Sequence, residues 1–283
     1  MKRRAFLNSL VASSLGGLAL TRASSHFASP ANKRLSRIGL QLYTVRGPLE
    51  KDFEGTLARV ASLGYTEVEF AGYFNHKPEE VKAVLNRLNL RAPSAHISTA
   101  VLRGNLQEAI DAAHTIGHEY VVCAYLPAEE RRTMDDYKRL IDRFNSAGEQ
   151  FRKAGIQFAY HNHDFEFQRM GEKLPYDVIL AETDPVTVKM EIDLYWITKA
   201  GQNPLEYFRR YPGRFPLAHI KDMDATPKRF FTEVGQGTID FKKILSSAGT
   251  AGFKHYFVEQ DETPGSPFSS IKISFDYLKQ LQF

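Results

Sequence analysis

Four side chains of the kinds that bind metals in proteins follow four consecutive β-rich segments of this chain. They are His161, Asp193, His219 and Glu259. They lie 32, 26 and 40 residues apart, about the length of one strand and one helix in each case. Mixed imidazole and carboxylate ligands suit Mn²⁺, Co²⁺, Zn²⁺ or Fe²⁺, with Mg²⁺ as a further option. The sequence therefore predicts a site for one divalent cation and leaves the element open.

These residues need elements that bring them to one place, and β-rich and amphipathic stretches alternate about eight times along the chain. The expected strands are Arg37–Val45, Glu67–Phe70, Ala92–Ile97, Tyr120–Tyr125, Gln157–His163, Thr187–Leu194, Pro216–Lys221 and His255–Gln260. The expected helices include Phe53–Leu63, Pro78–Leu88, Leu106–Ile116 and Asp135–Lys153. Glycines that suit helix ends precede several strands, namely Gly64, Gly117, Gly155 and Gly252. Strict alternation predicts a parallel sheet with helical crossovers.

Eight such units in roughly 250 residues predict a single (β/α)8 barrel over residues 37–283. An open, doubly wound sheet of Rossmann type is the alternative, but no Gly-x-Gly-x-x-Gly sequence opens any of the expected helices. In a barrel, the carboxyl ends of the strands build the active site. Alternate residues of a strand share a face, so His163, Lys221 and Asp261 are expected on the same faces as the ligands two residues before them.

Five sequence runs carry a family resemblance. They are AYHNHDFEF, MEIDLYW, LAHIKDMD, EVGQGTID and YFVEQD. Together they resemble the sugar phosphate isomerase/epimerase family of xylose isomerase-like barrels. The resemblance spans nearly the whole chain after its first residues and is most specific from 157 to 261. It implies a metal held by Glu, Asp, His and Glu at the ends of strands five to eight. Asp193, His219 and Glu259 fit that pattern, whereas His161 stands where a glutamate is common.

This departure affects the mechanism that the resemblance implies. In ketose 3-epimerases of the superfamily, two metal-bound glutamates exchange the proton of the sugar carbon. With His161 in place of one, Glu259 remains as a catalytic acid or base, and its partner is sought among His163, Lys221 and Glu166. His163 titrates near neutral pH without special tuning. The ammonium of Lys221, beside the metal, suits stabilisation of a developing enolate.

Further side chains are expected to contact the substrate. Glu69 and His96 end the second and third strands and suit sugar hydroxyls, Glu166 lies just beyond the fifth strand, and Trp196 suits the apolar face of a sugar ring. For each of them a structural role is the alternative. The Gly235-Gln-Gly237 sequence has the composition of a phosphate-binding loop but indicates little more than a turn. Acidic residues after the eighth strand disfavour a phosphorylated substrate.

The first 28 residues have the features of an export signal. Arg3, Arg4, Phe6 and Leu7 match the twin-arginine pattern, and a mildly apolar stretch too short to span a bilayer follows. This segment holds four of the 37 basic residues and no acid, so the remainder has 33 bases and 33 acids. A neutral mature chain disfavours nucleic-acid binding. We expect a periplasmic protein without a stable membrane anchor; the oligomeric state is not indicated. Cys123, the single cysteine, allows no intrachain disulfide.

The leading functional hypothesis is a metal-dependent sugar isomerase or epimerase that removes a proton next to the carbonyl of an unphosphorylated sugar or keto-sugar. The first alternative is a lyase or dehydratase on the same scaffold, including enzymes that cleave 3-keto-glycosides, since elimination needs the same first step. The second alternative is a non-catalytic sugar-binding barrel. Phosphodiester hydrolysis, known in related endonucleases, is disfavoured by the neutral charge of the mature chain.

Overall fold

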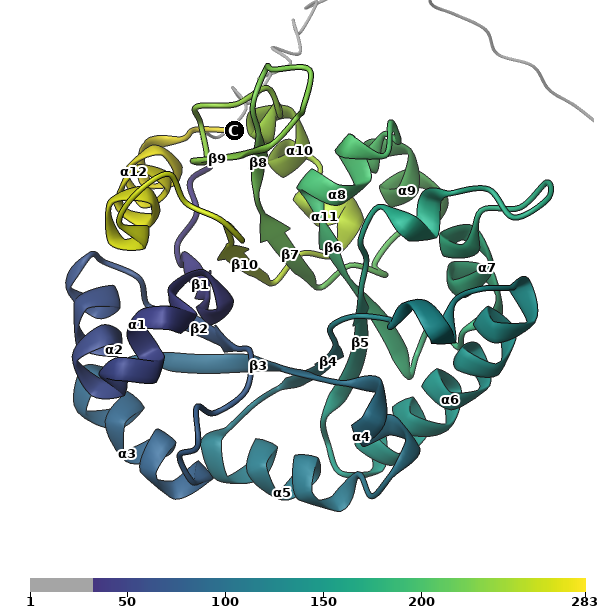
Figure 1. The fold of residues 1–283 in the computed structure, drawn as a ribbon, viewed down its shortest axis with the longest axis horizontal. Helices are drawn as coiled ribbons and strands as arrows, with labels where there is room; N and C mark the ends of the chain where they lie inside the picture. Colours follow the sequence, from purple (N-terminus) through teal and green to yellow (C-terminus); the bar gives the residue numbers. More distant parts are fainter. Residues whose placement is uncertain (1–32) are drawn as a thin grey trace, which may run out of the picture. The chain divides into compact units, whose positions relative to one another are not determined.

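The structure, a computed structural model, describes residues 33–283 and contains a closed barrel of eight parallel strands (Figure 1). Around the barrel, neighbouring strands follow the order β1-β10-β7-β6-β5-β4-β3-β2. Their bounds are β1 Gly39–Gln41, β2 Glu67–Phe70, β3 Arg91–Ile97, β4 Tyr120–Cys123, β5 Gln157–His161, β6 Val188–Asp193, β7 Leu217–Ile220 and β10 His255–Val258. Two short strands, β8 Asp222–Met223 and β9 Phe231–Thr232, form a separate antiparallel pair. The predicted (β/α)8 barrel is confirmed.

Helices surround the sheet, as Figure 1 shows in a view into the barrel. The outer helices are α2 Phe53–Ser62, α3 Pro78–Leu88, α5 Gln107–Ile116, α6 Met134–Lys153, α7 Pro175–Glu182, α9 Pro204–Arg210, α10 Phe241–Ser246, α11 Ala248–Ala251 and α12 Pro267–Gln280. Shorter helices follow individual strands, namely η1 Leu42–Val45, α1 Arg46–Lys51, α4 Thr99–Arg103, η2 Ala128–Glu130, η3 Phe165–Phe167 and α8 Leu194–Lys199. The four glycines expected at helix ends all have positive φ, from +77° to +107°.

The longest helix, α6, shows how the sequence fixes these elements. It begins at Thr133, whose side chain accepts a hydrogen bond from the amide of Asp136 while the Asp136 carboxylate accepts one from the amide of Thr133. Its buried residues recur every three or four positions, as in Tyr137, Leu140, Ile141, Phe144, Ala147 and Phe151. Each buried phenylalanine contributes about 1.5–3 kcal/mol. Gly148 lets the helix approach β6, since a Cβ there would lie 2.8 Å from the Thr187 carbonyl oxygen.

Two strands that lead to the site are shorter than their sequences predict. β1 ends at Gln41, whose side-chain oxygen accepts a hydrogen bond from the amide of Tyr43 and starts the turn of η1. β5 ends at His161, which leaves His163 in the following loop. The predicted export signal, residues 1–28, lies outside the described residues. Among residues 33–283, no helix has both the length and the apolar character needed to cross a membrane.

Polar side chains lie inside the barrel at two heights along its axis. Glu67 and Glu69, successive inward-facing residues of β2, mark these two levels. Glu67, nearer the amino ends of the strands, accepts a hydrogen bond from His255 Nδ1 at 2.8 Å and forms ion pairs with Arg37 and Arg91 at 3.1 and 3.2 Å. Glu69, two residues on, faces the opposite end. An apolar group that includes Val122, Ala159, Leu217 and Phe257 forms a small cluster of its own, apart from the main core. The barrel is therefore packed, and its chemistry is concentrated at the carboxyl ends of the strands.

Candidate metal centre

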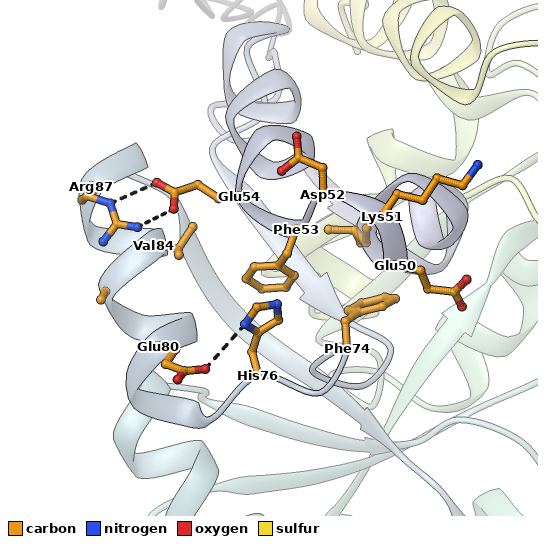
Figure 2. Close-up of a pocket in the computed structure, with 12 residues that line it drawn as sticks. Glu50, Lys51, Asp52, Phe53, Glu54, Phe74, His76, Glu80, Val84 and Arg87 are labelled. Atoms are coloured by element: carbon orange, nitrogen blue, oxygen red, sulfur yellow. Dashed lines mark hydrogen bonds and ion pairs between the residues drawn. The ribbon is translucent and has the colours of Figure 1, made fainter.

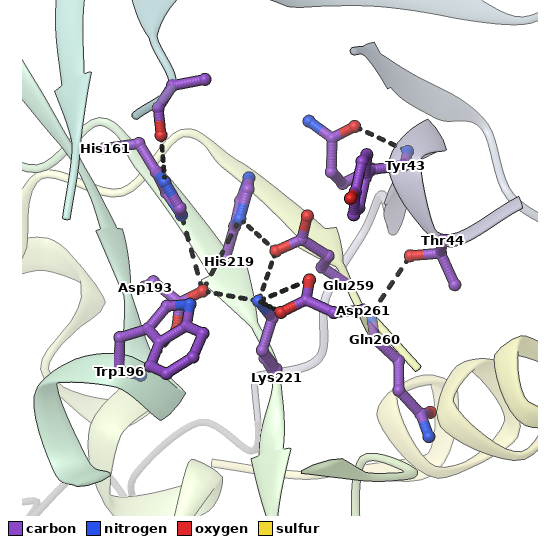
Figure 3. A network of polar contacts seen from close by, with 12 residues as sticks. Tyr43, Thr44, His161, Asp193, Trp196, His219, Lys221, Glu259, Gln260 and Asp261 are labelled. Carbon is purple, nitrogen blue, oxygen red and sulfur yellow. Dashed lines mark hydrogen bonds and ion pairs between the residues drawn. The ribbon is translucent and has the colours of Figure 1, made fainter. Parts of the chain in front are cut away.

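The structure brings the four predicted ligands together at the ends of β5, β6, β7 and β10. One donor atom from each of His161, Asp193, His219 and Glu259 lies within 4.8 Å of each of the others, and all four residues are buried. Strand register explains the grouping, because Asp193 is paired with His219 across β6 and β7. Figure 3 shows the side chains of Asp193, His219 and Glu259 turned toward one another. These residues meet as the sequence predicts.

Two atoms of this group have unsatisfied bonding capacity that a cation fits. His161 Nε2 and Asp193 Oδ2 lie 3.5 Å apart, and each is buried without a hydrogen-bond partner. Buried polar atoms are normally hydrogen-bonded, and Asp193 Oδ2 has only an ion-pair contact with Lys221 Nζ at 3.2 Å, so His161 Nε2 is the atom that points to a missing partner. The other ring nitrogen of His161 lies 3.1 Å from the Ala124 carbonyl oxygen, to which it donates, so Nε2 keeps its lone pair for a metal. Two imidazoles and two carboxylates fit a divalent transition metal.

Lys221 provides a buried positive charge beside the ligands. Its Nζ lies 2.7 Å from Glu259 Oε2, 3.2 Å from Asp193 Oδ2 and 3.1 Å from both carboxylate oxygens of Asp261. Burial disfavours the ammonium, but these three carboxylates raise the pKa of Lys221 well above its usual range. Burial likewise opposes ionisation of Asp193, yet Lys221 and His161 lower the pKa of that carboxyl to about 2. The ligand carboxylates are therefore ionised and the lysine is charged.

His163 is a neutral imidazole at the edge of the metal centre. Its ring packs edge-on against the ring of His161, with centroids 4.8 Å apart, and its Nδ1 has no hydrogen-bond partner. Burial lowers the pKa of His163 well below its usual range, and the nearby His161 and Lys221 lower it further. The imidazole is therefore neutral with a free lone pair, and the expectation that it titrates near neutral pH is wrong, because burial and the neighbouring charges lower its pKa.

A cavity of about 920 Å³ opens above the metal centre. His161, His163, Lys221 and Glu259 line it together with the predicted substrate contacts His96 and Trp196. Its wall also includes Tyr43, Tyr125 and Phe230, large apolar side chains that are 43%, 46% and 39% exposed. Pockets of this size suit small organic ligands, and exposed aromatic rings suit the apolar faces of sugars or of attached groups.

Two predicted substrate contacts lie away from this cavity. Glu69 is fully buried beneath the ligands, where Gln41, Ser94 and His219 donate hydrogen bonds to its carboxylate. Glu166, the middle residue of η3, is fully buried, and the Tyr160 hydroxyl and the amide of His163 donate to its carboxylate. Burial raises the pKa of Glu166 to about 7, although these hydrogen bonds lower it. Neither carboxylate is exposed in the cavity, so we correct their predicted role as substrate contacts.

The prediction also left two acidic residues without a role. Glu191, two residues before Asp193 on the same face of β6, is fully buried, with Oε2 2.7 Å from His96 Nε2. Asp261, two residues after Glu259, lines the cavity. Burial raises the pKa of Asp261 although Lys221 lowers it. The alternation of strand faces was the signal that pointed to both residues.

The backbone amides of the Gly235-Gln-Gly237 loop bind a carboxylate of the same chain, that of Asp222. The amides of Gly235 and Gly237 donate to Asp222 Oδ2 at 2.9 and 3.1 Å, and the amide of Ile239 donates to Oδ1 at 3.2 Å. Gly237 is required there, because a Cβ would lie 2.3 Å from Asp222 Oδ1. This carboxylate anchors the segment that carries Phe230 and Phe231 to the cavity wall.

A second hollow, of about 590 Å³, lies on the outer surface between α2, α3 and the loop after β2 (Figure 2). Four of its polar residues are paired with one another: Arg87 donates to Glu54 at 2.7 and 3.1 Å, and His76 lies 3.5 Å from Glu80. His76 also stacks on Phe53 with ring centroids 4.2 Å apart. This hollow therefore has none of the unpaired ligand atoms found in the barrel mouth.

A family profile described as "xylose isomerase-like TIM barrel" matches residues 57–281. The chain belongs to this family. The closed barrel and the ligand group at its mouth agree with that membership. The xylose isomerase-like fold, predicted from the five sequence runs, is thus confirmed by an independent comparison.

Within this family, the chain is similar to proteins with different names. It is 25% identical over 259 residues to an inosose dehydratase of Lacticaseibacillus casei, covering 77% of this chain and 86% of that protein. A solved sugar phosphate isomerase/epimerase of Parabacteroides distasonis is 29% identical, with a TM-score of 0.74 over 89% of this chain and 96% of that one. The IolI protein, solved with a zinc atom, is 16% identical, with a TM-score of 0.68 over 85% and 95% of the two chains.

Proposed function

We propose that this protein is a divalent-metal-dependent lyase that eliminates a group from an unphosphorylated keto-cyclitol or keto-sugar. The observation that carries the proposal is His161 Nε2, buried without a hydrogen bond 3.5 Å from Asp193 Oδ2, within a group of four candidate ligands beside a neutral histidine. Similarity to inosose dehydratases favours elimination over the isomerase or epimerase hypothesis. The chain also lacks the glutamate pair that the family resemblance implies for proton exchange, because His161 replaces one member.

The residues at the mouth of the barrel suit the steps of an elimination. A bound divalent cation supplies Lewis acidity that polarises the substrate carbonyl. His163, neutral and open to the cavity, accepts the proton from the carbon next to that carbonyl. Lys221 lies close enough to the ligands for its ammonium to stabilise the negative charge that develops on oxygen. The C–H electrons form the double bond between the α and β carbons, the C–O bond to the β-hydroxyl breaks, and the departing hydroxyl takes the proton held by His163 and leaves as water, which returns the imidazole to its neutral form.

Cleavage of a 3-keto-glycoside is a second candidate that shares these steps, with the glycosidic oxygen as the leaving group. The cavity volume of about 920 Å³ favours this reaction, since it leaves room for an attached group. The exposed rings of Tyr125 and Phe230 favour it as well, since they offer apolar contact to such a group. A 3-keto-glycoside with a nitrophenyl leaving group tests it directly, because nitrophenol release is coloured. Export through residues 1–28 is also part of the proposal, and it suits a substrate without phosphate.

The experiment begins with elemental analysis of the purified protein and of His161→Ala. We expect about one Mn, Co, Zn, Fe or Mg ion per wild-type chain and loss of that ion in the variant. Retention of the full metal content by His161→Ala would show that the ligand assignment is wrong. The His163→Asn variant should keep the metal and lose about 10²–10⁴-fold in turnover, because only the base is removed.

The reaction is then followed in deuterium oxide with an inosose and with 3-keto-glycosides. Loss of water or of the aglycone supports the lyase. Incorporation of deuterium without elimination would instead establish the isomerase or epimerase. Tight metal and sugar binding with neither reaction would leave the sugar-binding barrel as the function.

A further inference from the structure

A second group of residues lies beneath the predicted ligands; Glu69 and Glu191 are fully buried there, and His96 also lines the cavity. Glu69 from β2, His96 from β3 and Glu191 from β6 surround the inner side of His219. Glu69 Oε2 lies 2.7 Å from His219 Nε2, and Glu191 Oε2 lies 3.3 Å from the same nitrogen. The other ring nitrogen, Nδ1, lies 3.0 Å from Glu259 Oε2 in the ligand group. His219 therefore connects the two layers through its two nitrogens.

We infer that Glu69 is a positioning residue that fixes the metal-binding nitrogen of His219. Glu69 accepts the proton of Nε2, so the lone pair of Nδ1 is directed at the ion. A carboxylate on the far nitrogen of a ligating histidine sets its tautomer and ring orientation and raises its basicity. This inference rests on the proposed metal centre but does not depend on which reaction the centre catalyses.

The position of Glu69 is fixed by donors from two further strands. Gln41 of β1 donates to Oε2 at 2.7 Å, and Ser94 of β3 donates to Oε1. The carboxylate is fully buried, so water does not compete for it. Donors from three strands, together with the close packing of the barrel, leave the acceptor oxygen little freedom to move away from His219.

Hydrogen bonds account for most of this lower layer, although Glu191 Oε1 is buried without a hydrogen-bond partner. Two nitrogen–oxygen separations of 2.7 Å, from His219 to Glu69 and from His96 to Glu191, are hydrogen-bond lengths. Glu69, His96, Glu191 and His219 nevertheless offer four donor atoms within 4.8 Å of one another. A second bound cation is therefore an outcome that the test must detect, since it would make Glu69 a ligand.

The chain contains a matched control on the same strand. Glu67, two residues before Glu69, is equally buried and accepts a hydrogen bond from His255 Nδ1 at 2.8 Å. The His255 side chain is not part of either ligand group. Glu67→Gln and Glu69→Gln thus make the same chemical change to two buried Glu–His pairs in one barrel, and only the second pair reaches the metal centre.

The test uses metal-free full-length protein with ¹⁵N-labelled histidine, titrated with ¹¹³Cd²⁺. We expect one cadmium per chain, with one-bond coupling to His219 Nδ1 and a proton on Nε2. Glu69→Gln should weaken Cd²⁺ binding by about 10–100-fold, as loss of such partners does elsewhere, while Glu67→Gln should change it less than about twofold. If Glu69→Gln does not fold, Ser94→Ala removes one donor from the carboxylate and should weaken binding by a smaller factor.

Wild-type affinity in both Glu69→Gln and Ser94→Ala would overturn the inference. So would a second bound cadmium coupled to His219 Nε2, which would identify Glu69 as a ligand. Failure of the proposed lyase function looks different, because it leaves the cadmium couplings and the ratio between the two glutamine variants unchanged and removes only turnover.

Discussion

The two ends of the barrel contain similar residues in opposite states. At the amino ends of the strands, Glu67 has partners on every side: His255 and two half-exposed arginines. At the carboxyl ends, His161 Nε2 lies buried without a hydrogen bond, and three carboxylates, including that of Asp193, surround the single ammonium of Lys221. Satisfied charge stabilises a fold, whereas unsatisfied charge is retained where a ligand completes it. In the comparison, one end has its buried charges paired, and the other has the residues that we propose bind an ion.

The largest expected effect is stabilisation of the ligand end by metal. Added Zn²⁺ or Mn²⁺ at about 1,000 times its Kd should stabilise the chain by about 4 kcal/mol, or roughly 10 °C in Tm for a domain of this size. Calorimetry of chelator-treated protein with and without the ion measures this shift. Asp193→Ala should abolish it, and an equal shift in that variant would place the ion elsewhere.

At the amino ends of the strands, we expect a substitution to change stability without changing metal affinity. Glu67→Ala leaves His255 buried without its acceptor and should lower the free energy of unfolding by about 3 kcal/mol. Urea denaturation gives that value, and metal titration of the same variant should match wild type. A change in metal affinity as large as that of a ligand variant would show that the two ends are not independent.

The stability of the metal-free protein should depend on pH because of His96, which lies toward the carboxyl ends of the strands. Burial opposes protonation of His96, but Glu69 and Glu191 raise its pKa to about 10. The protonated imidazole therefore contributes stability below about pH 6.5, the pKa of an unfolded histidine, and that stability is lost as the pH rises toward 10. The loss should approach about 1.4 kcal/mol per pH unit, measured by urea denaturation, and should disappear in His96→Gln. A slope that persists in His96→Gln would assign the effect to another group.

Lys221 should separate metal binding from catalysis. Its ammonium lies 3.2 Å from Asp193 and repels a cation bound to the same carboxylates. Lys221→Met should therefore raise metal affinity about tenfold while turnover falls, because the charge that stabilises the developing oxyanion is gone. Competition with a chromogenic chelator measures the first effect. Weaker metal binding in this variant would instead mean that Lys221 holds the carboxylates in place.

The smallest effect is expected outside the barrel, at the hollow of Figure 2. The side chains of Arg87 and Glu54 are each 54% exposed, so Arg87→Ala should cost less than about 1 kcal/mol. Turnover should equal that of wild type. A marked fall in turnover would show that this hollow, rather than the barrel mouth alone, contributes to activity.

Strand periodicity was enough to predict that His161, Asp193, His219 and Glu259 would meet, because a residue at the end of a parallel strand reaches the same rim in every barrel unit. The bounds of β2 and α3 also agree with the sequence prediction. How deep each inward-facing residue lies within the barrel could not be predicted from strand periodicity. The register between β2 and β3 shifts between Glu67 and Glu69, and a sequence pattern does not show which inward residue reaches the mouth.

Loops and turns have no comparable residue periodicity, and the prediction of Glu166 as a substrate contact was wrong. Glu166 follows β5 closely enough to suggest a site residue, but the turn of η3 directs its carboxylate inward to Tyr160. His163 likewise lies in the loop after β5 and not on the strand, where the sequence pattern had placed it. Its contact with His161 depends on the path of the loop, which the sequence alone does not specify.

The loop around Asp222 has a consequence for selectivity. Amides of Gly235, Gly237 and Ile239 converge on a carboxylate of the same chain, an arrangement that in other proteins receives a phosphate. Here the anion is covalently part of the protein, so its effective concentration is fixed and no free anion competes with it on equal terms. The loop amides are thereby occupied by the Asp222 carboxylate and are not free to bind a phosphate group.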